Sequence, residues 1–257
     1  MGYKVIDGRG IIPDGVTEIE THAFSGCTSL KSIEIPDSVT RIGSWAFHGC
    51  TSLKSIEIPN SVTMIEMWAF SGCTSLQSID IPDSVTWIDG SIFSGCNNLT
   101  SIIVSKNNSR YKSTNNCILT KDGKKLVLCR NHNILDSVTE IGDSAFSGCT
   151  SLKSIEIPNS VTEIGEWAFS GGSSLQSIVI PEDVNEIKNW AFKACTSLQS
   201  IEIPNSVTEI GYEAFSGCTS LQSIVIPEGV NEIKNWTFKD CTSLQSIEIP
   251  DSVTKIG

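Results

Sequence analysis

Cysteine is the residue with the widest range of chemistry in this chain, and it recurs at a fixed interval. Cysteines stand at positions 27, 50, 73 and 96, and the same 23-residue register returns at 149, 195, 218 and 241. Thiols in such a series are able to bind metal ions, to form a ladder of disulfides, to act as nucleophiles or to pack as a buried structural spine. The residues around them decide between these four roles.

The surroundings of the cysteines favour the structural spine. No Cys-x-x-Cys pair is present, and the three histidines, His22, His48 and His132, are scattered, so the spacing of a zinc site is missing. A reactive thiol needs a neighbouring base and an electropositive setting, which identical thiols in every repeat cannot all have. Parallel side chains on stacked coils do not supply disulfide geometry, and Gly172 replaces one cysteine. We therefore expect small buried apolar groups, and no metal or other cofactor.

The cysteine is one position of a repeat that runs along most of the chain. Its pattern is C-x-x-L-x-x-I-x-I-P-x-x-V-x-x-I-x-x-x-A-F-x-x, and all nine prolines occupy its tenth position. The alternating isoleucines of "SLKSIEI" predict a short strand, which the following proline ends because it lacks an N–H donor. "SVTEIG" predicts a second short extended segment, and "MWAFSGC" predicts one helical turn that is stable only when packed.

No single repeat can bury its Leu, Ile, Val and Phe side chains, but stacked repeats can. Each apolar side chain then lies over its counterpart in the next coil, at a strand spacing of about 4.8 Å. The sequence therefore predicts a mainly β solenoid of about ten coils with short helical turns. We expect one array over residues 1–257, with an N-terminal repeat block (1–96), an irregular insert (97–135) and a C-terminal repeat block (136–257).

The motif L-x-x-I-x-I is the strand signature of leucine-rich repeats. The 23-residue repeat, with I-P-x-x-V-x-x-I and a closing A-F-x-x-C, closely resembles the BspA-like leucine-rich repeat family of bacterial and protozoan surface proteins. The resemblance covers nearly the whole chain apart from the insert, and it implies a right-handed leucine-rich repeat superhelix. It also implies a virulence-associated adhesin, secreted or at the cell surface, that binds a host extracellular-matrix or cell-surface protein.

The insert breaks the repeat and contains a turn signal. Asp122-Gly123 lies between "CILT" and "KKLVLC", which predicts a β-hairpin that replaces or extends one coil. The insert is also the basic part of the chain, so it is either a solvated connector between the two blocks or a contact element. Cys117 and Cys129 flank the predicted hairpin and are the candidates for a disulfide, the alternative being two free thiols.

In a solenoid, each repeat position forms one column on the surface. The position between the two strand isoleucines is mostly acidic, as Glu34, Glu57, Asp80, Glu156, Glu202 and Glu248. This column is either a solvated acidic face or a site for cations or a basic protein surface, although calcium prefers converging oxygens to a flat row.

A second column precedes the Ala-Phe pair and is rich in tryptophan, as Trp45, Trp68, Trp167, Trp190 and Trp236. Ser and Glu occupy the same position in other repeats, so we expect the column to be partly exposed. The rings either shield the edge of the core or form an aromatic strip for a protein partner, with a carbohydrate partner as the less favoured alternative.

Composition and motifs exclude several classes of function. The formal net charge of −11 and the pI of about 4.7 argue against binding to nucleic acid or to an anionic membrane surface. No apolar run is long enough to span a membrane, and "MGYKVIDGRG" lacks the layout of a secretory signal. No phosphate loop, HExxH or GxSxG motif is present, and every candidate carboxylate recurs in several repeats, which argues against an enzyme.

We therefore expect a non-catalytic protein-binding or adhesion module that presents a repeated surface to a macromolecule. A structural spacer array without a ligand of its own is the alternative. The sequence ends at "DSVTKIG", within a repeat, and an open coil end allows end-to-end self-association. From position 172 onward the repeats alternate in pairs, with Val or Glu between the isoleucines, which gives a 46-residue super-period.

Overall fold

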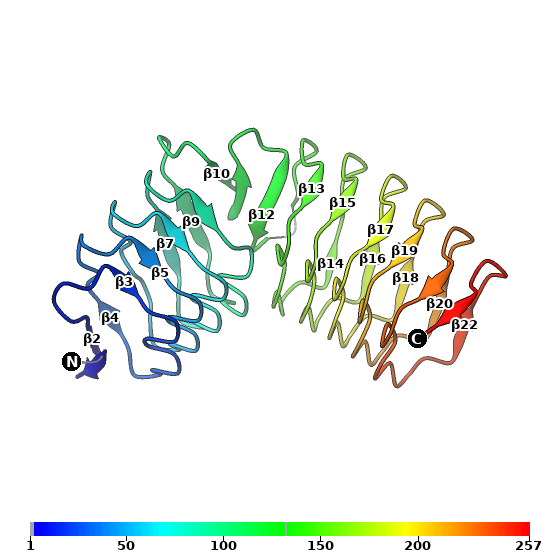
Figure 1. The fold of residues 1–257 in the computed structure, drawn as a ribbon, viewed down its shortest axis with the longest axis horizontal. Coiled ribbons are helices and arrows are strands. Elements are labelled where there is room, and N and C mark those ends of the chain that lie inside the picture. The colour runs from blue at the N-terminus through cyan, green and yellow to red at the C-terminus, as the bar shows by residue number, and fades with distance from the viewer. Residues whose placement is uncertain (1–2, 132) are drawn as a thin grey trace. The chain divides into compact units, whose positions relative to one another are not determined.

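The computed structural model describes residues 3–131 and 133–257, so His132 lies outside the described part. The chain divides into two compact units: unit 1 is Met1–Asp122 with Val127–Arg130, and unit 2 is Gly123–Leu126 with Asn131–Gly257. Each unit is a stack of coils in which short strands lie beside those of the next coil (Figure 1). The predicted β-solenoid is confirmed, with about 11 turns where about ten were expected.

In unit 1 the second strand of each coil forms a four-stranded parallel sheet. It consists of β3 (Glu18–Ile19), β5 (Arg41–Ile42), β6 (Met64–Ile65) and β8 (Trp87–Ile88). The first strands of the coils form two smaller sheets: β1 (Lys4–Ile6), β2 (Arg9–Ile11) and β4 (Ser32–Ile33) in one, and β7 (Ser78–Ile81) with β9 (Ser101–Val104) in the other. Residues 54–58, which lie between these two sheets in sequence, form no strand.

In unit 2 both strands of each coil stack in parallel, and identical repeat positions face each other. The second strands are β13 (Glu140–Ile141), β15 (Glu163–Ile164), β17 (Glu186–Ile187), β19 (Glu209–Ile210), β21 (Glu232–Ile233) and β23 (Lys255–Ile256). The first strands are β14 (Ser154–Ile155), β16 (Ser177–Val179), β18 (Ser200–Glu202), β20 (Ser223–Val225) and β22 (Ser246–Glu248). We call the outward side of these first strands the Ser–Ile face. Its register pairs Ser177 with Ser200 and Val179 with Glu202.

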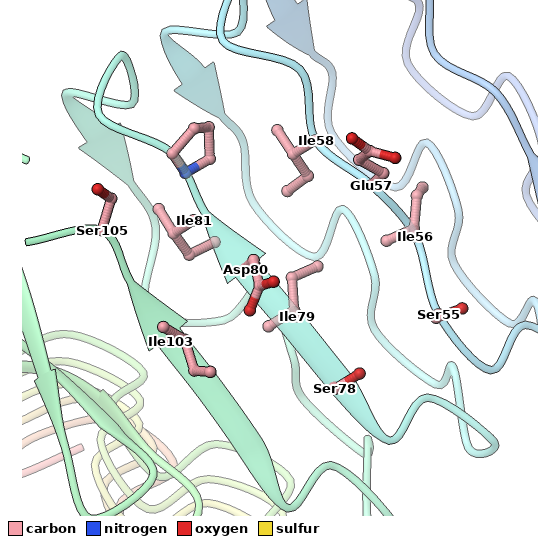
Figure 2. Close-up of a pocket in the computed structure, with 11 residues that line it drawn as sticks. Ser55, Ile56, Glu57, Ile58, Ser78, Ile79, Asp80, Ile81, Ile103 and Ser105 are labelled. Carbon is pink, nitrogen blue, oxygen red and sulfur yellow. The ribbon is translucent and has the colours of Figure 1, made fainter.

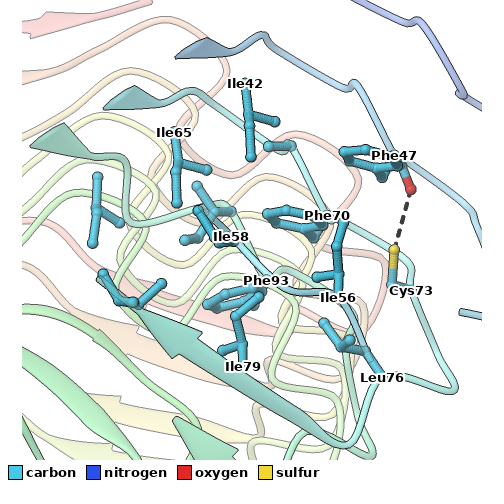
Figure 3. Packing of buried hydrophobic residues seen from close by; sticks show 14 of the residues in the cluster. Ile42, Phe47, Ile56, Ile58, Ile65, Phe70, Cys73, Leu76, Ile79 and Phe93 are labelled. Atoms are coloured by element: carbon cyan, nitrogen blue, oxygen red, sulfur yellow. Dashed lines mark hydrogen bonds between the residues drawn. The ribbon is translucent and has the colours of Figure 1, made fainter. Parts of the chain in front are cut away.

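The core of each unit is a set of apolar columns, one for each buried position of the repeat. The Phe of the Ala-Phe pair stacks on its counterpart in the next coil, with ring centroids 5.3 Å apart for Phe47 and Phe70 and 5.3 Å apart for Phe169 and Phe192. These rings are almost fully buried beside the strand isoleucines (Figure 3). Burial of one such side chain contributes about 1.5–3 kcal/mol, so the ladder is a large part of the stability.

The predicted helical turns are wrong. The segments around each Ala-Phe pair form hydrogen-bonded turns, and the described residues contain no helix. The residue before Ala has a left-handed backbone, as at Trp45 with a φ of 61°, which ends any right-handed helix. The turn also bonds sideways: the N–H of Phe47 donates to the carbonyl of Ala69 in the next coil at 2.8 Å.

The insert contains one more strand than the sequence predicted. β10 (Tyr111–Thr114) pairs antiparallel with β11 (Cys117–Thr120) through a turn at Asn115 and Asn116, both of which have positive φ. The predicted turn at Asp122 and Gly123 follows, and it leads into β12 (Lys125–Cys129). Cys117 and Cys129 form a disulfide, and the N–H of Arg130 donates to the carbonyl of Asn116 at 3.1 Å. The end of β12 is therefore held beside the start of β11.

The repeated cysteines are a buried spine, as predicted, and they also act as hydrogen-bond donors. The Sγ atom of Cys73 lies 3.1 Å from the carbonyl oxygen of Phe47 in the preceding coil (Figure 3). The same thiol-to-carbonyl bond is made by Cys50, Cys96, Cys195, Cys218 and Cys241, at 3.0 to 3.2 Å. Burial raises the pKa of the Cys96 thiol to about 11 and that of the Cys195 thiol to about 12, so both stay protonated at neutral pH.

These buried thiols predict that the protein loses stability as the pH rises above about 8.5, the ordinary thiol pKa. Between that value and the raised folded-state pKa, the unfolded chain releases thiol protons that the folded chain keeps, so unfolding becomes more favourable. Urea unfolding in the presence of a reductant, followed from pH 8 to pH 10.5, measures this slope. Cys195→Ala should show a shallower slope than the wild type, because one such thiol is gone. An identical slope would contradict a protonated, buried Cys195.

Candidate functional site

The acidic column predicted from the sequence lies on the outward face of the first strands. Glu34, Glu57, Asp80, Glu156, Glu202 and Glu248 are all exposed. In unit 1 the column includes Ile103, which is 53% exposed, and in unit 2 it includes Val179 and Val225, which are 65% and 55% exposed. The column is therefore a mixed acidic and apolar surface.

Two of these acidic residues share a hollow in unit 1. A groove of about 540 Å³ is lined by Glu57, Asp80 and Ile103, together with neighbouring serines and isoleucines. Figure 2 shows these side chains along adjacent coils. The hollow lies where residues 54–58 form no strand.

The tryptophan column lies at a backbone position that disfavours large side chains. Trp45, Trp68, Trp167, Trp190 and Trp236 have φ values between 53° and 61°. The left-handed region costs a bulky residue about 1–3 kcal/mol. His22, Ser144 and Glu213 occupy the same column with φ values of 62°, 58° and 50°, so the fold imposes this backbone and the side chain does not.

The rings of the column contact one another from coil to coil, and we call this set the aromatic strip. In unit 1 the ring centroids of Trp45 and Trp68 are 4.7 Å apart, and His22 and His48 contact Trp45. In unit 2 the rings of Trp167 and Trp190 stack 4.6 Å apart. Trp236 is 53% exposed, and the other four tryptophans are half-buried.

Tyr212 continues the strip where the tryptophan position is occupied by Glu213. Its ring contacts Trp190 at 5.6 Å and Trp236 at 5.4 Å, so the strip in unit 2 is continuous over four aromatic side chains. Tyr212 is not among the residues that the sequence predicted, because it lies one position before the tryptophan column. The available signal was an aromatic residue directly before Glu213, the non-aromatic position between Trp190 and Trp236.

Two lysines add positive charge to the strip. The Nζ atom of Lys193 lies 5.6 Å from the ring centroid of Trp167, and that of Lys239 lies 5.1 Å from the ring centroid of Trp236. Both distances are typical of cation–π contacts. Lys193 also forms an ion pair with Glu213, and this hydrogen bond lowers the pKa of the Glu213 carboxyl. The strip thus has aromatic, cationic and anionic groups within one row.

A second glutamate column, which the sequence analysis did not single out, lies on the other sheet of unit 2. We call it the Glu ladder: Glu140, Glu163, Glu186, Glu209 and Glu232, one each on β13, β15, β17, β19 and β21. Like charges at strand spacing repel, but lysines neutralise most of them, through Lys125–Glu140, Lys188–Glu163, Lys234–Glu209 and Lys255–Glu232. The Glu ladder is therefore largely an ion-pair network that links coils.

Chemistry that requires several converging ligands is not found in the part of the chain that the structure describes. No group of three or more His, Cys, Asp or Glu side chains there is arranged to hold a metal ion. Within the same residues, no helix is long and apolar enough to cross a lipid bilayer. The predicted surface residues are spread along the coils and form rows.

Comparison with known proteins identifies the repeat. The family model described as "BspA type Leucine rich repeat region" matches residues 10–119, 126–218 and 193–257, in six copies. No curated protein matches the chain. Several solved structures of bacterial leucine-rich repeat proteins are similar to it.

The pneumococcal vaccine antigen PcpA superposes with a TM-score of 0.74 at 24% identity, over 96% of this chain and 61% of that one. A leucine rich cell surface protein from Faecalibacterium prausnitzii gives a TM-score of 0.60 at 25% identity, over 96% of this chain and 92% of that one. A leucine-rich repeat protein from Eubacterium ventriosum gives 0.64 at 23% identity, over 96% and 82%. The chain thus spans less than two thirds of the pneumococcal antigen, and these likenesses show a shared fold.

The pairing of Lys193 with Glu213 predicts a defined pH effect. Because Glu213 has a lowered pKa in the folded protein, it adds stability above the unfolded-state value of about 4.3, and this stability is lost as the pH falls through the folded-state pKa. Lys193→Met should remove that contribution, so its stability should fall less steeply between pH 5 and pH 2. Thermal unfolding at several pH values measures the difference.

Lys239→Met is the matched control, because Lys239 contacts Trp236 and is in no ion pair within the described residues. Both variants lose a cation–π contact worth about 0.5–1 kcal/mol at an exposed site. The acid dependence of Lys239→Met should match that of the wild type. If Lys193→Met also matches the wild type, the ion pair contributes nothing in solution.

Proposed function

This chain belongs to the BspA-type leucine-rich repeat family, and on that premise we propose that it is a non-catalytic protein-binding module of a secreted or cell-surface protein. Its partner is a host extracellular-matrix or cell-surface protein. The aromatic strip supplies the anchoring side chains, and the coils hold them in a rigid row. The Faecalibacterium neighbour is described as a cell surface protein, which supports the location in this proposal.

The observation that carries the proposal is the backbone of the tryptophan column. Ser144 shows that a small polar residue fits the same left-handed position, and the strain of that position falls on every large side chain placed there. Tryptophan nevertheless fills it in five coils while remaining partly exposed. Strained, exposed aromatic residues are more readily explained by recognition than by folding, since Trp is enriched among the residues that dominate binding energy.

The geometry of the rings favours a protein over a carbohydrate partner. Sugars stack on open ring faces, but Trp167 and Trp190 cover each other's faces, with ring planes only 17° apart. What remains beside the stacked faces is the ring edges and the ammonium groups of Lys193 and Lys239. Such groups complement the mixed apolar and polar rim of a protein surface.

Replacement of Trp167 and Trp190 by Ser should weaken binding at least tenfold while the solenoid stays folded, because the backbone at this position already accepts Ser in this chain. Binding is measured against a panel of purified extracellular-matrix proteins on a biosensor surface, and against a glycan array. Thermal unfolding reports the fold. Phe169→Ala and Phe192→Ala serve as contrasting variants, since loss of a fully buried Phe costs about 3–5 kcal/mol.

Three outcomes separate the alternatives. Loss of matrix-protein binding with an unchanged unfolding temperature supports the proposal. If the Trp variants unfold as readily as the Phe variants, the column belongs to the core and the proposal loses its main support. If the wild type binds no protein on the panel, the chain acts as a spacer without a ligand.

A further inference from the structure

The Ser–Ile face of unit 2 has a regular pattern of short and protruding side chains. Along each first strand the outward residues are a serine and then Glu or Val, as in Ser154 and Glu156, whereas the proline that follows is half-buried or buried, as at Pro158 and Pro181. Serine is short, so the Glu or Val side chain stands above the serine before it. From coil to coil the Glu or Val column contains Glu156, Val179, Glu202, Val225 and Glu248, which are all exposed. This column is therefore a row of alternating carboxylates and apolar side chains, which we call the ridge.

The carboxylates of this ridge differ from those of the Glu ladder. In the Glu ladder four of five glutamates have a lysine partner. On the ridge, Glu156, Glu202 and Glu248 are in no ion pair with any described residue. The nearest column on the same face contains Lys153 in the first coil and then Gln176, Gln199, Gln222 and Gln245, so later coils supply no countercharge. This negative charge is left available to an external partner.

The valines set the distance between the charges. Adjacent strands are about 4.8 Å apart, so glutamates in every second coil are about 9.6 Å apart. That separation exceeds the Debye length of about 8 Å at physiological ionic strength, which relieves their mutual repulsion. Unit 1 lacks the alternation, because Glu34, Glu57 and Asp80 occupy consecutive coils, and Glu34 is paired with Arg9.

This spacing matches the repeat of an α-helix. Seven residues of a helix rise about 10.5 Å, and three or four residues rise about 4.5–6 Å. A helix that runs across the strands of this face would place residues i, i+7 and i+14 near the three glutamates. Its residues i+3 or i+4, and i+10 or i+11, would lie over Val179 and Val225. The register drifts by only about 1 Å for each heptad, which long basic side chains absorb.

We propose that the Ser–Ile face of unit 2 binds a basic amphipathic α-helix of a partner protein, with Lys or Arg at every seventh residue and apolar residues between them. The proposal rests on the function proposed above and assigns a class of partner to a second surface, separate from the aromatic strip. Charge complementarity and the alternation of Glu with Val support a helix in particular. An extended strand repeats on one side about every 6.7 Å, which fits neither the coil spacing nor twice that spacing.

A polyproline II segment is the closest competitor, because three residues rise about 9.3 Å. Its lysines at every third residue would reach the three glutamates. The two residues between them, however, point about 120° to either side, so neither lies over the valine. A helix places an apolar side chain on the same stripe as the lysines at half the repeat, and this is where Val179 and Val225 stand.

The test uses the full chain and three synthetic peptides labelled for fluorescence anisotropy. The first is a helical peptide with Lys at i, i+7 and i+14 and Leu at i+3 and i+10. The second has the same composition with the lysines moved to a five-residue spacing, and the third is a polyproline peptide with Lys at every third residue. We expect the heptad peptide to bind at least about tenfold more tightly than either control, with affinity that falls as salt is added.

Two variants distinguish register from simple attraction between opposite charges. Replacing Glu156, Glu202 and Glu248 by Gln should weaken heptad-peptide binding at least about tenfold. Val179→Glu with Val225→Glu adds negative charge but removes the apolar contacts, so it should also weaken binding. Tighter binding by this second variant would show unspecific attraction of cations and would overturn the proposal. Replacing Glu57 by Gln and Asp80 by Asn in unit 1 is the control and should leave binding unchanged.

The remaining outcomes also decide the matter. Equal affinity for the five-residue spacing, or tighter binding of the polyproline peptide, would refute the helix. Absence of heptad-peptide binding at low salt, the condition that favours such binding, would also refute the helix. These results are independent of the Trp167 and Trp190 variants, which report on matrix-protein binding. Failure of the helix proposal therefore does not decide the proposed function, which is tested by those variants.

Discussion

The structure depends on hydrogen bonds that connect each coil to the next. Within one coil the strands are two to five residues long, far too short to be stable alone. At most turns the Phe N–H donates to the carbonyl of the residue before Phe in the following coil, as Phe47 does to Ala69, and the cysteine thiol donates to a Phe carbonyl in the preceding coil. These bonds fix the coils in register, and the register stacks each Phe on the Phe of the next coil and aligns the tryptophan positions. Surface rows are thus a consequence of backbone pairing.

Much of this fold was predictable because a repeat multiplies each signal. The Ile alternation, the proline at the strand end and the buried cysteine occur many times, so chance agreement is small, and the solenoid, the two strands of each coil and the spine follow from them. The predicted helical turn at "MWAFSGC" was wrong because its residues are compatible with a helix, and only the neighbouring coil supplies the carbonyl acceptors that favour a turn. The pairing of β10 with β11 in the insert was missed since it occurs once and has no repeat to support it.

The candidate site, too, was predictable only in part. Membership of a column could be read from the sequence, which is why the acidic and tryptophan rows were found. The sequence did not reveal how a residue in one column compensates for a residue in another. Tyr212 restores the aromatic contact that Glu213 interrupts. Lys188 neutralises Glu163 of the preceding coil. The left-handed backbone under the tryptophans was also hidden, because His, Ser, Glu and Trp are all unusual residues for it. These effects depend on three-dimensional neighbours.

The alternation of coils in unit 2 also bears on how such an array can change in length. Lys188 and Lys234 each reach back to a glutamate of the preceding coil, and the same position is glycine in the alternate coils, at Gly165 and Gly211. Removal or duplication of one coil would set Glu beside Glu, or Val beside Val, on the Ser–Ile face, and would set glycine beside glycine or lysine beside lysine in this column. Gain or loss of two coils preserves every contact. The unit of duplication in unit 2 is therefore a pair of coils, and an array of this kind should vary in length by even numbers of coils.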